Sequence, residues 1–267
     1  MARPNLIIFS DLDGTLLDHQ NYSWEAAKPA LERVQESGIP VVLSSSKTAA
    51  EVRALRAELG NEEPYIVENG AAVVLPGPWL GAEEDRVVNF GASREVVLSV
   101  LQRLRDGGAR FQGFADMSVE QLAQCAGLDR ATASLAKERH GTEPLLWQGT
   151  AAQLQAFEAE LAEENLRLVQ GGRFFHAMGR FDKADGARFL LSKYRERYGP
   201  APLASIALGD SPNDQRMLET ADIPVVIRGV NSDQVQLSAR RHAMRSIKPG
   251  PAGWNDCVLN ILCEYGY

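Results

Sequence analysis

Short apolar runs alternate with helical segments at the start of this chain, and that alternation most constrains its fold. Apolar residues 6–9 predict a buried strand, and residues 24–36 follow with the spacing of a helix. Residues 39–43 predict a second strand, residues 49–59 a helix and residues 65–67 a third strand. Strand, helix, strand, helix, strand is typical of a parallel sheet with right-handed crossovers. We therefore predict an α/β fold.

The same alternation returns near the end of the chain, after a middle region in which it loosens. We predict that residues 86–181 form an inserted α/β unit with its own small sheet, and that residues 1–85 and 182–267 form one core. The alternative is that the middle third simply continues one domain. The later core elements expected are helices at 183–197, 213–220 and 255–264 and strands at 204–208 and 223–227. The inserted elements expected are helices at 94–106, 118–125, 130–139 and 151–164 and strands at 87–90, 144–147, 166–169 and 173–178.

Composition excludes several classes of function. The net charge of −7 disfavours broad nonspecific binding of nucleic acid, although local cations can still attract an anionic small molecule. No apolar stretch approaches the roughly 18 residues of a membrane span, and a signal-peptide pattern is absent. Cys125, Cys257 and Cys263 are odd in number and lack metal-ligand spacing. We expect a cytoplasmic protein with reduced thiols and no nucleic-acid or membrane partner, and the oligomeric state stays open.

Two carboxylates, Asp11 and Asp13, follow directly on the first apolar run. Open α/β sheets bind their ligands at the carboxyl ends of their strands. Such a pair can hold a divalent cation through hard oxygen ligands. One carboxylate can also attack phosphorus while the other transfers protons. A polar turn is the alternative, because Asp and Gly are ordinary turn residues.

Further polar residues follow other expected strands. Ser45 comes just after the second strand, where its hydroxyl could donate to a phosphate oxygen, and Lys47 adds a cation beside it. Serine equally favours turns and helix caps, and a single lysine is usually a solvated surface charge. Asp210 follows the strand at 204–208 and would point at the same crevice as the first aspartates, while Asp214 could support or complete a metal shell.

Lys183 opens the helix that follows the inserted unit. A lysine near a nucleophilic carboxylate would keep that carboxylate ionised and would neutralise the charge of a phosphate. A solvent-exposed lysine is the alternative. Lysine gains nothing from the helix dipole at a helix start, which makes its placement there suggestive of a function.

Taken in order, these motifs resemble those of the haloacid dehalogenase superfamily of phosphatases. The resemblance covers nearly the whole chain and implies a Rossmann-like core with a parallel sheet. The insertion is similar to the larger α/β cap of that superfamily, the C2 type. The motifs are Asp11-Leu12-Asp13-Gly14-Thr15, Ser45, Lys183 and Gly209-Asp210 through Asn213-Asp214.

The resemblance implies a role for each motif. Asp11 would be the nucleophile that forms an aspartyl-phosphate, and Asp13 would be first the general acid and then the general base. Ser45 and Lys183 would bind the transferring phosphoryl group. Phosphoryl transfer needs positioning and dispersed positive charge, which these residue types supply.

The resemblance also implies a magnesium cofactor. Mg²⁺ would be held by the Asp11 side chain, the Asp13 backbone carbonyl and Asp210, with Asp214 in support. Mg²⁺ commonly keeps several waters and uses few protein carboxylates.

Within the superfamily, the chain most resembles the mannosyl-3-phosphoglycerate phosphatases. The resemblance rests on residues 45–48 (Ser-Ser-Lys-Thr), 67–70 (Val-Glu-Asn-Gly) and 171–176 (Gly-Gly-Arg-Phe-Phe-His), the last followed by Asp182-Lys183. It implies hydrolysis of mannosyl-3-phosphoglycerate to mannosylglycerate and phosphate. The alternatives are glucosyl-3-phosphoglycerate or a hexose phosphate as substrate, a sugar phosphomutase, and a sensor without catalysis.

Five residues would then recognise the substrate. The planar fork of Arg173 suits the glycerate carboxylate, and His176 can hydrogen-bond sugar hydroxyls or that carboxylate. Glu68 and Asn69 would read the glycerate or the sugar from the core side, and Lys47 would contribute a cation. For Arg173 and His176 the alternative is a polar strand face of the cap.

Overall fold

The expected parallel sheet is present at the centre of the larger part of the molecule. The computed structural model describes residues 3–170, 173–238 and 243–267. Five parallel strands lie in the order β12-β11-β10-β1-β2. They are β1 (Asn5–Ser10), β2 (Val41–Leu43), β10 (Leu203–Gly209), β11 (Ile223–Arg228) and β12 (Met244–Pro249). The expected α/β core is therefore confirmed, with β12 as an additional edge strand.

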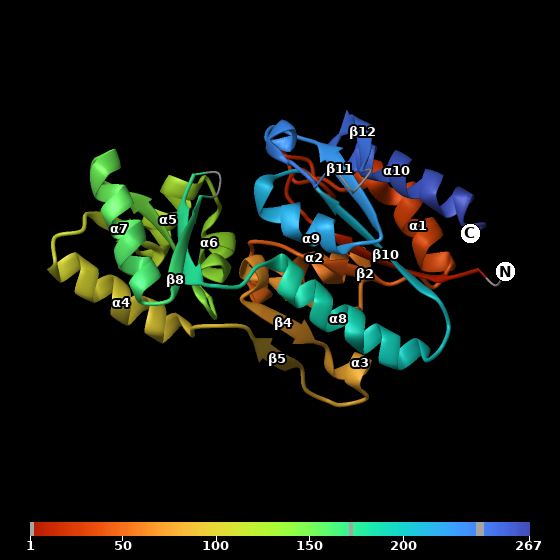
Figure 1. Ribbon diagram of the computed structural model, residues 1–267, viewed down its shortest axis with the longest axis horizontal. Coiled ribbons are helices and arrows are strands. Elements are labelled where there is room, and N and C mark those ends of the chain that lie inside the picture. Colours follow the sequence, from red (N-terminus) through yellow and green to blue (C-terminus); the bar gives the residue numbers. More distant parts are fainter. Residues whose placement is uncertain (1–2, 171–172, 239–242) are drawn as a thin grey trace.

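Helices cover both faces of this sheet (Figure 1). Leu6 and Ile8 of β1 pack on one face, and Ile7 and Phe9 pack on the other. Strands buried on both faces have nearly continuous apolar runs, which explains why the sequence signal of β1 was clear. The first face is covered by α1 (Lys28–Glu36), α2 (Ala49–Leu59) and α10 (Gly250–Glu264), and the second by α8 (Lys183–Tyr198) and α9 (Gln215–Thr220).

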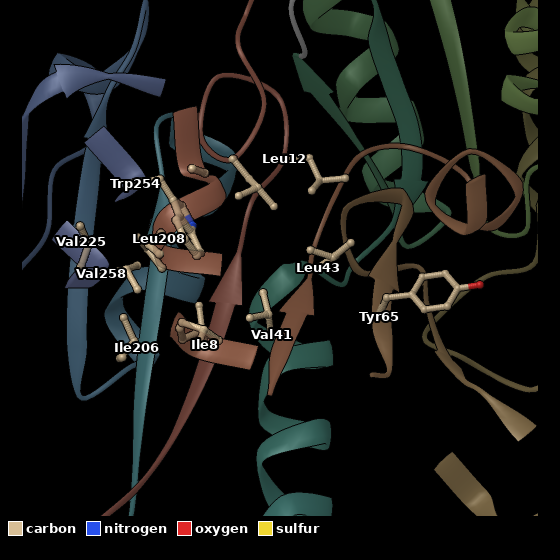
Figure 2. Packing of buried hydrophobic residues seen from close by; sticks show 14 of the residues in the cluster. Ile8, Leu12, Val41, Leu43, Tyr65, Ile206, Leu208, Val225, Trp254 and Val258 are labelled. Atoms are coloured by element: carbon tan, nitrogen blue, oxygen red, sulfur yellow. The ribbon is translucent and has the colours of Figure 1, made fainter. Parts of the chain in front are cut away.

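Figure 2 shows the first face, where Trp254 of α10 packs among Ile8, Leu208 and Val258. The Trp254 indole N–H donates to the Ser10 hydroxyl at 3.0 Å. This buried contact supports the end of β1, where the acidic motif begins.

A second, antiparallel sheet extends the core beside β2. It consists of β3 (Tyr65–Val67), β4 (Ala72–Leu75) and β5 (Arg86–Asn89), and the short helix α3 (Gly77–Leu80) connects β4 to β5. A single parallel bridge from Ser44 to Ile66 joins this sheet to the end of β2. Two expectations are corrected here. Residues 65–67 do not extend the parallel sheet as a full strand, and the strand at 87–90 pairs with β4 rather than with the inserted sheet.

The residues expected to form an inserted unit, 86–181, contain a four-stranded antiparallel sheet, and we call this unit the cap. Its strand order is β6-β7-β9-β8, with β6 (Phe111–Gly113) unexpected from the sequence. Figure 1 shows the cap beside the core, with α4 and α7 on the cap's outer side. The other cap strands are β7 (Thr142–Trp147), β8 (Leu166–Gln170) and β9 (Phe175–Gly179), and the helices are α4 (Arg94–Asp106), α5 (Val119–Ala126), α6 (Arg130–Ala136) and α7 (Ala151–Glu163).

Some expected boundaries in the cap differ from the structure by two or three residues. The helix expected at 130–139 ends at Ala136, and the strand expected at 173–178 begins at Phe175. Gly171 and Gly172 of the expected motif lie outside the described residues. No helix in the described ranges has both the length and the apolar character needed to cross a membrane. Cys125, Cys257 and Cys263 are free thiols.

Candidate active site

Three aspartate carboxylates come together where β1 and β10 end. Asp11 follows β1, and Asp210 and Asp214 lie after β10, where the chain enters the 3₁₀ turn η4 (Pro212–Asp214). One oxygen of each carboxylate lies within 4.8 Å of the others, and all three residues are buried. The backbone N–H of Asp11 donates to the Leu208 carbonyl at 2.9 Å, which ties the two strand ends together. The parallel sheet thus joins residues nearly 200 positions apart.

Lys183 lies within this acidic group. Its side chain is fully buried, and its ammonium contacts one oxygen of Asp11 and, at 2.6 Å, one oxygen of Asp214. Burial alone would lower the pKa of Lys183, but the charges of Asp11 and Asp214 outweigh burial and raise it. Lys183 therefore carries a permanent positive charge at the point where the three carboxylates meet.

One lysine does not balance three buried carboxylates. Burial, followed by the charge of Asp214, raises the pKa of Asp11 well above its usual range and raises the pKa of Asp210 to about 7. A divalent cation would remove this excess of negative charge, and carboxylate oxygens are the hard ligands that Mg²⁺ prefers. The donor set of Asp11, Asp210 and Asp214 therefore fits a magnesium ion.

Two glycines make room for the Asp210 carboxylate. A Cβ on Gly14 would lie 2.6 Å from one Asp210 oxygen, and Gly14 also has a φ of +85°. A side chain at Gly229 would overlap the same oxygen. The Thr15 hydroxyl donates to the other oxygen at 3.3 Å. The acidic motif and the later loop therefore fit together only with small residues at these positions.

The Asp13 side chain lies outside the three-carboxylate group. One of its oxygens is 3.0 Å from the Lys47 ammonium, and the Asp13 side chain is 33% exposed. Its other oxygen is buried and has no hydrogen-bond partner among the described residues. The two aspartates of the motif thus occupy different surroundings: Asp11 contacts a buried lysine, and Asp13 contacts a lysine nearer the solvent.

Ser45 lies in the loop after β2, next to the acidic motif. Its side chain is buried, and its hydroxyl oxygen accepts a hydrogen bond from the backbone N–H of Lys47 at 3.1 Å. The backbone N–H of Ser45 donates to the Ile66 carbonyl at 3.0 Å. The loop is therefore fixed between β2 and β3, with the Lys47 ammonium directed to Asp13.

The Glu68 side chain is not positioned to bind the substrate. Its side chain is fully buried, and both of its carboxylate oxygens accept hydrogen bonds from cap residues 140–142. The Arg139 guanidinium lies 3.6 Å away. Because protein donors occupy both oxygens, the expectation that Glu68 contacts the sugar or the glycerate is corrected: Glu68 joins the core to the cap.

Asn69 follows Glu68 and lies beside the acidic loop. Its side-chain oxygen accepts a hydrogen bond from the Asn213 amide at 3.2 Å. Asn213 precedes Asp214, so Asn69 contacts the loop that carries two of the three carboxylates. Asn69 thus lies at the rim of the candidate active site.

Known proteins are similar to this chain in both sequence and fold. A relative from Persephonella marina, glucosyl-3-phosphoglycerate/mannosyl-3-phosphoglycerate phosphatase, is 37% identical over 269 residues, which cover 97% of this chain and 98% of the relative. The family model of haloacid dehalogenase-like hydrolases matches residues 8–115. The chain belongs to the haloacid dehalogenase-like hydrolases.

Solved structures of this superfamily have the same fold. BT1666 from Bacteroides thetaiotaomicron superposes with a TM-score of 0.68 at 20% identity, covering 99% of this chain and 96% of its own. The subclass IIB sugar phosphatase BT4131 superposes with a TM-score of 0.66 at 15% identity, covering 98% and 99%. The expected phosphoric monoester hydrolase of the mannosyl-3-phosphoglycerate phosphatase family is confirmed.

Arg173, on the cap, is exposed and contacts the end of a cap helix. Its guanidinium donates to the carbonyl of Ala126 at 2.7 Å and to that of Cys125 at 3.4 Å, at the end of α5. A cation that binds the last carbonyls of a helix stabilises the helix end. In this structure Arg173 caps α5 through Nη1, and the expectation that it binds the glycerate carboxylate stays a prediction.

His176 lies on β9 and is half-buried. Burial, followed by the charge of Arg139, lowers the pKa of His176 to about 3. Its Nδ1 is buried and has no hydrogen-bond partner among the described residues. The ring is neutral at ordinary pH, so it can hydrogen-bond a hydroxyl but cannot pair with a carboxylate as a cation.

Sequence reasoning missed the residues that hold the site together. Arg139 and Thr142 come from the cap and surround the Glu68 carboxylate, and Trp254 supports the strand end before Asp11. None belongs to a motif with chemical meaning, and each acts on a residue more than 70 positions away. No local signal in the sequence predicts such contacts.

Proposed function

We propose that this enzyme is a Mg²⁺-dependent phosphatase that hydrolyses mannosyl-3-phosphoglycerate to mannosylglycerate and phosphate through an aspartyl-phosphate on Asp11. The observation that carries the proposal is the buried Lys183 joined to Asp11 and Asp214 within the three-carboxylate group. The relative from Persephonella marina is named for both the glucosyl and the mannosyl ester. Glucosyl-3-phosphoglycerate is therefore the second candidate substrate.

In the first step, an oxygen of Asp11 attacks phosphorus and the bond from phosphorus to the glycerate oxygen breaks. Asp13 donates its proton to the departing oxygen, which needs that proton because an alkoxide is a poor leaving group. Lys183 and the Ser45 hydroxyl bind the phosphoryl oxygens and offset their charge. The contact with Lys183 opposes the burial that raises the pKa of Asp11 and so favours its ionised, nucleophilic form.

In the second step, a water molecule replaces the organic product beside the aspartyl-phosphate. Asp13, now ionised, takes a proton from this water as the water oxygen bonds to phosphorus. The bond from phosphorus to the Asp11 oxygen breaks, which frees phosphate and restores the carboxylate. A partly exposed Asp13 can exchange protons with solvent between the steps.

The proposed magnesium ligands are the Asp11 side chain, the Asp13 backbone carbonyl and Asp210, with Asp214 in support. Bound Mg²⁺ would neutralise the charge that develops on the phosphoryl oxygens. Asp214 accepts hydrogen bonds at 3.2 Å from the backbone N–H groups of Asp210 and Ser211. These contacts hold Asp210 toward Asp11.

The cap is proposed to close the site over the substrate and to exclude water. Lys47, Asn69, Arg173 and His176 remain our candidates for binding the sugar or the glycerate. We keep residues 1–85 and 182–267 as the proposed core and residues 86–181 as the cap, with β5 also pairing with the core. We also propose a cytoplasmic location, in line with the three free thiols.

A panel of phosphate-release assays tests this function. Mannosyl- and glucosyl-3-phosphoglycerate are compared with hexose 6-phosphates, with and without Mg²⁺. We expect Mg²⁺-dependent release and the highest kcat/KM for a sugar phosphoglycerate. A preference for hexose 6-phosphates would overturn the substrate, and isomerised sugar phosphate without free phosphate would indicate a mutase.

Asp11→Asn is the matched control for that panel. We expect it to abolish turnover, because the amide cannot attack phosphorus, while circular dichroism and Tm show an intact fold. Asparagine removes one of the crowded negative charges, so Tm should not fall. Phosphate release by this variant would remove Asp11 as the nucleophile.

A further inference from the structure

We infer that the turn Glu68-Asn69-Gly70 sets the position of the cap relative to the catalytic loops, with Glu68 as the positioning residue. The inference rests on the proposed function for its kinetic consequence, although its structural part stands independently. We call the three residues the junction turn. They form the 3₁₀ turn η2 between β3 and β4.

The junction turn has an unusual backbone. Glu68, Asn69 and Gly70 have φ values of +51°, +56° and +97°, so three consecutive residues lie in the left-handed region. Residues other than glycine disfavour this region, and such a conformation persists only where its surroundings impose it. Contacts on every side must therefore hold the turn.

On the core side, the junction turn contacts each catalytic loop. The backbone N–H of Asn69 donates to the Ser45 carbonyl at 2.8 Å, and that of Glu68 donates to the Lys47 carbonyl at 2.9 Å. Gly70 lies against the backbone of Asp182 and Lys183, where a Cβ would overlap the Asp182 carbonyl. Together with the Asn69 contact to Asn213, the turn touches all three loops around the acidic motif.

On the cap side, the Glu68 carboxylate binds the segment between α6 and β7. The backbone N–H groups of His140, Gly141 and Thr142 donate to it at 2.6, 3.2 and 3.0 Å, and the Thr142 hydroxyl donates at 2.7 Å. All four donors belong to the cap, and the carboxylate has no exposed surface. Glu68 is thus a buried anion of the core whose carboxylate oxygens accept their hydrogen bonds from the cap.

Two further hydrogen bonds continue this contact along the loop after β2. The Arg139 guanidinium donates to the Ser46 carbonyl at 2.9 Å, and the Thr48 hydroxyl donates to the Leu135 carbonyl at 2.9 Å. The loop with Ser45 and Lys47 is therefore hydrogen-bonded both to the junction turn and to the cap. A shift of cap residues 139–142 would move the groups that bind the phosphoryl oxygens.

A carboxylate suits this position better than an amide. Four donors converge on the two Glu68 oxygens, and glutamine offers one oxygen while its NH₂ group would face N–H donors. Glu68→Gln keeps the size of the side chain and removes part of the contact with the cap. Glu143→Gln is the matched control, because Glu143 is equally buried and accepts from Ala115 and Arg94, both within the cap.

The kinetic test compares a substrate that needs the cap with one that does not. The ratio of kcat/KM for a sugar phosphoglycerate to kcat/KM for p-nitrophenyl phosphate should fall about tenfold to a hundredfold in Glu68→Gln, since small misplacements cost that much. Glu143→Gln should keep the ratio within about twofold of the wild-type value, because the partners of Glu143 lie within the cap and make no hydrogen bond to Glu68. Equal ratios in Glu68→Gln and wild type would overturn the positioning role.

Hydrogen exchange tests the junction without any substrate. In Glu68→Gln, protection of backbone amides should fall at least about tenfold both at 139–142 and at 45–48, because local opening loses the same contacts. Glu143→Gln should lower protection only within the cap. Unchanged protection at 45–48 in Glu68→Gln would overturn the inference. A wild-type enzyme that hydrolyses neither ester would overturn the proposed function, and exchange would still decide the junction.

Discussion

At the scale of single residues, two aspartates that are adjacent in the motif have distinct environments. Asp11 is buried against Lys183, and Asp13 is partly exposed against Lys47. The sequence predicted both carboxylates and, through the family resemblance, their separate roles. It also placed Lys183 near the nucleophilic carboxylate, but it offered no basis for pairing Lys47 with Asp13, which lies 34 positions earlier.

His176 makes a residue-scale prediction about pH. Its pKa is lowered from 6.5 to about 3 by burial, so between these values the unfolded chain binds a proton that the folded chain does not. Its contribution to folding stability is therefore full above pH 6.5 and is lost as pH falls. Between pH 7 and pH 5 the loss is about 2 kcal/mol.

Chemical unfolding of His176→Asn and wild type checks this sign. The free energy of unfolding of the wild type should fall more between pH 7 and pH 5 than that of the variant. The same substitution at the exposed His19 serves as a control. An equal pH dependence in wild type and His176→Asn would contradict the burial of a neutral imidazole.

At the scale of elements, the sequence predicted strands that carry an apolar run and missed those that do not. β1, β10 and β11 were expected from such runs, whereas β12 has the polar sequence of a half-exposed edge strand. The apolar run at 87–90 did predict a strand, but an apolar run does not indicate which strand it pairs with. That strand pairs with its neighbour β4 in the core sheet.

The junction turn makes the element-scale prediction. Gly70→Ala would place a Cβ against the backbone at the start of α8 and so displace Lys183. Gly38 also has a positive φ, of +65°, but a Cβ there would meet nothing within 4 Å. Gly38→Ala should cost about 1–2 kcal/mol of unfolding free energy, the penalty of the left-handed region alone.

Gly70→Ala should cost about 1–3 kcal/mol more than Gly38→Ala, because it adds an overlap to the backbone penalty. It should also lower kcat, whereas Gly38→Ala should not. Urea unfolding and steady-state kinetics of the two variants make the comparison. A Gly70→Ala enzyme with the stability and kcat of Gly38→Ala would show that Gly70 does not hold α8 in place.

At the scale of the whole molecule, the order of the parallel strands brings the residues of the candidate active site together. Sequence reasoning could expect the carboxyl ends of β1, β2 and β10 to meet, since parallel strands bring distant motifs to one edge of a sheet. Sequence reasoning did not predict the contacts between the two domains. Glu68 was assigned to the substrate, whereas its carboxylate accepts hydrogen bonds from the cap.

Magnesium should stabilise the whole molecule in a pH-dependent way. In the metal-free protein the pKa of Asp210 is raised from 3.8 to about 7, so the folded state holds a proton that the unfolded state releases between these values. This contribution to stability is therefore present at low pH and is lost as pH rises toward 7. Mg²⁺ should replace the proton and restore the stability at higher pH.

Thermal unfolding with and without Mg²⁺ measures this effect. At pH 7.5 and about a hundredfold excess of Mg²⁺ over Kd, the gain of about 2.7 kcal/mol should raise Tm by about 5–10 °C. The rise should be smaller at pH 5, where the cation competes with protons. Asp210→Asn should lose most of the rise. A larger rise at pH 5 than at pH 7.5 would contradict the proposed metal site.

The most direct test of the catalytic centre is to look for phosphate on Asp11. In Asp13→Asn with p-nitrophenyl phosphate, the leaving group needs little protonation, so Asp11 should still attack, while hydrolysis of the aspartyl-phosphate should lack its base. Acid quenching followed by peptide mass spectrometry should find a phosphorylated Asp11. Phosphate on another residue, or release of p-nitrophenolate in a burst with Asp11 unmodified, would contradict the proposed mechanism.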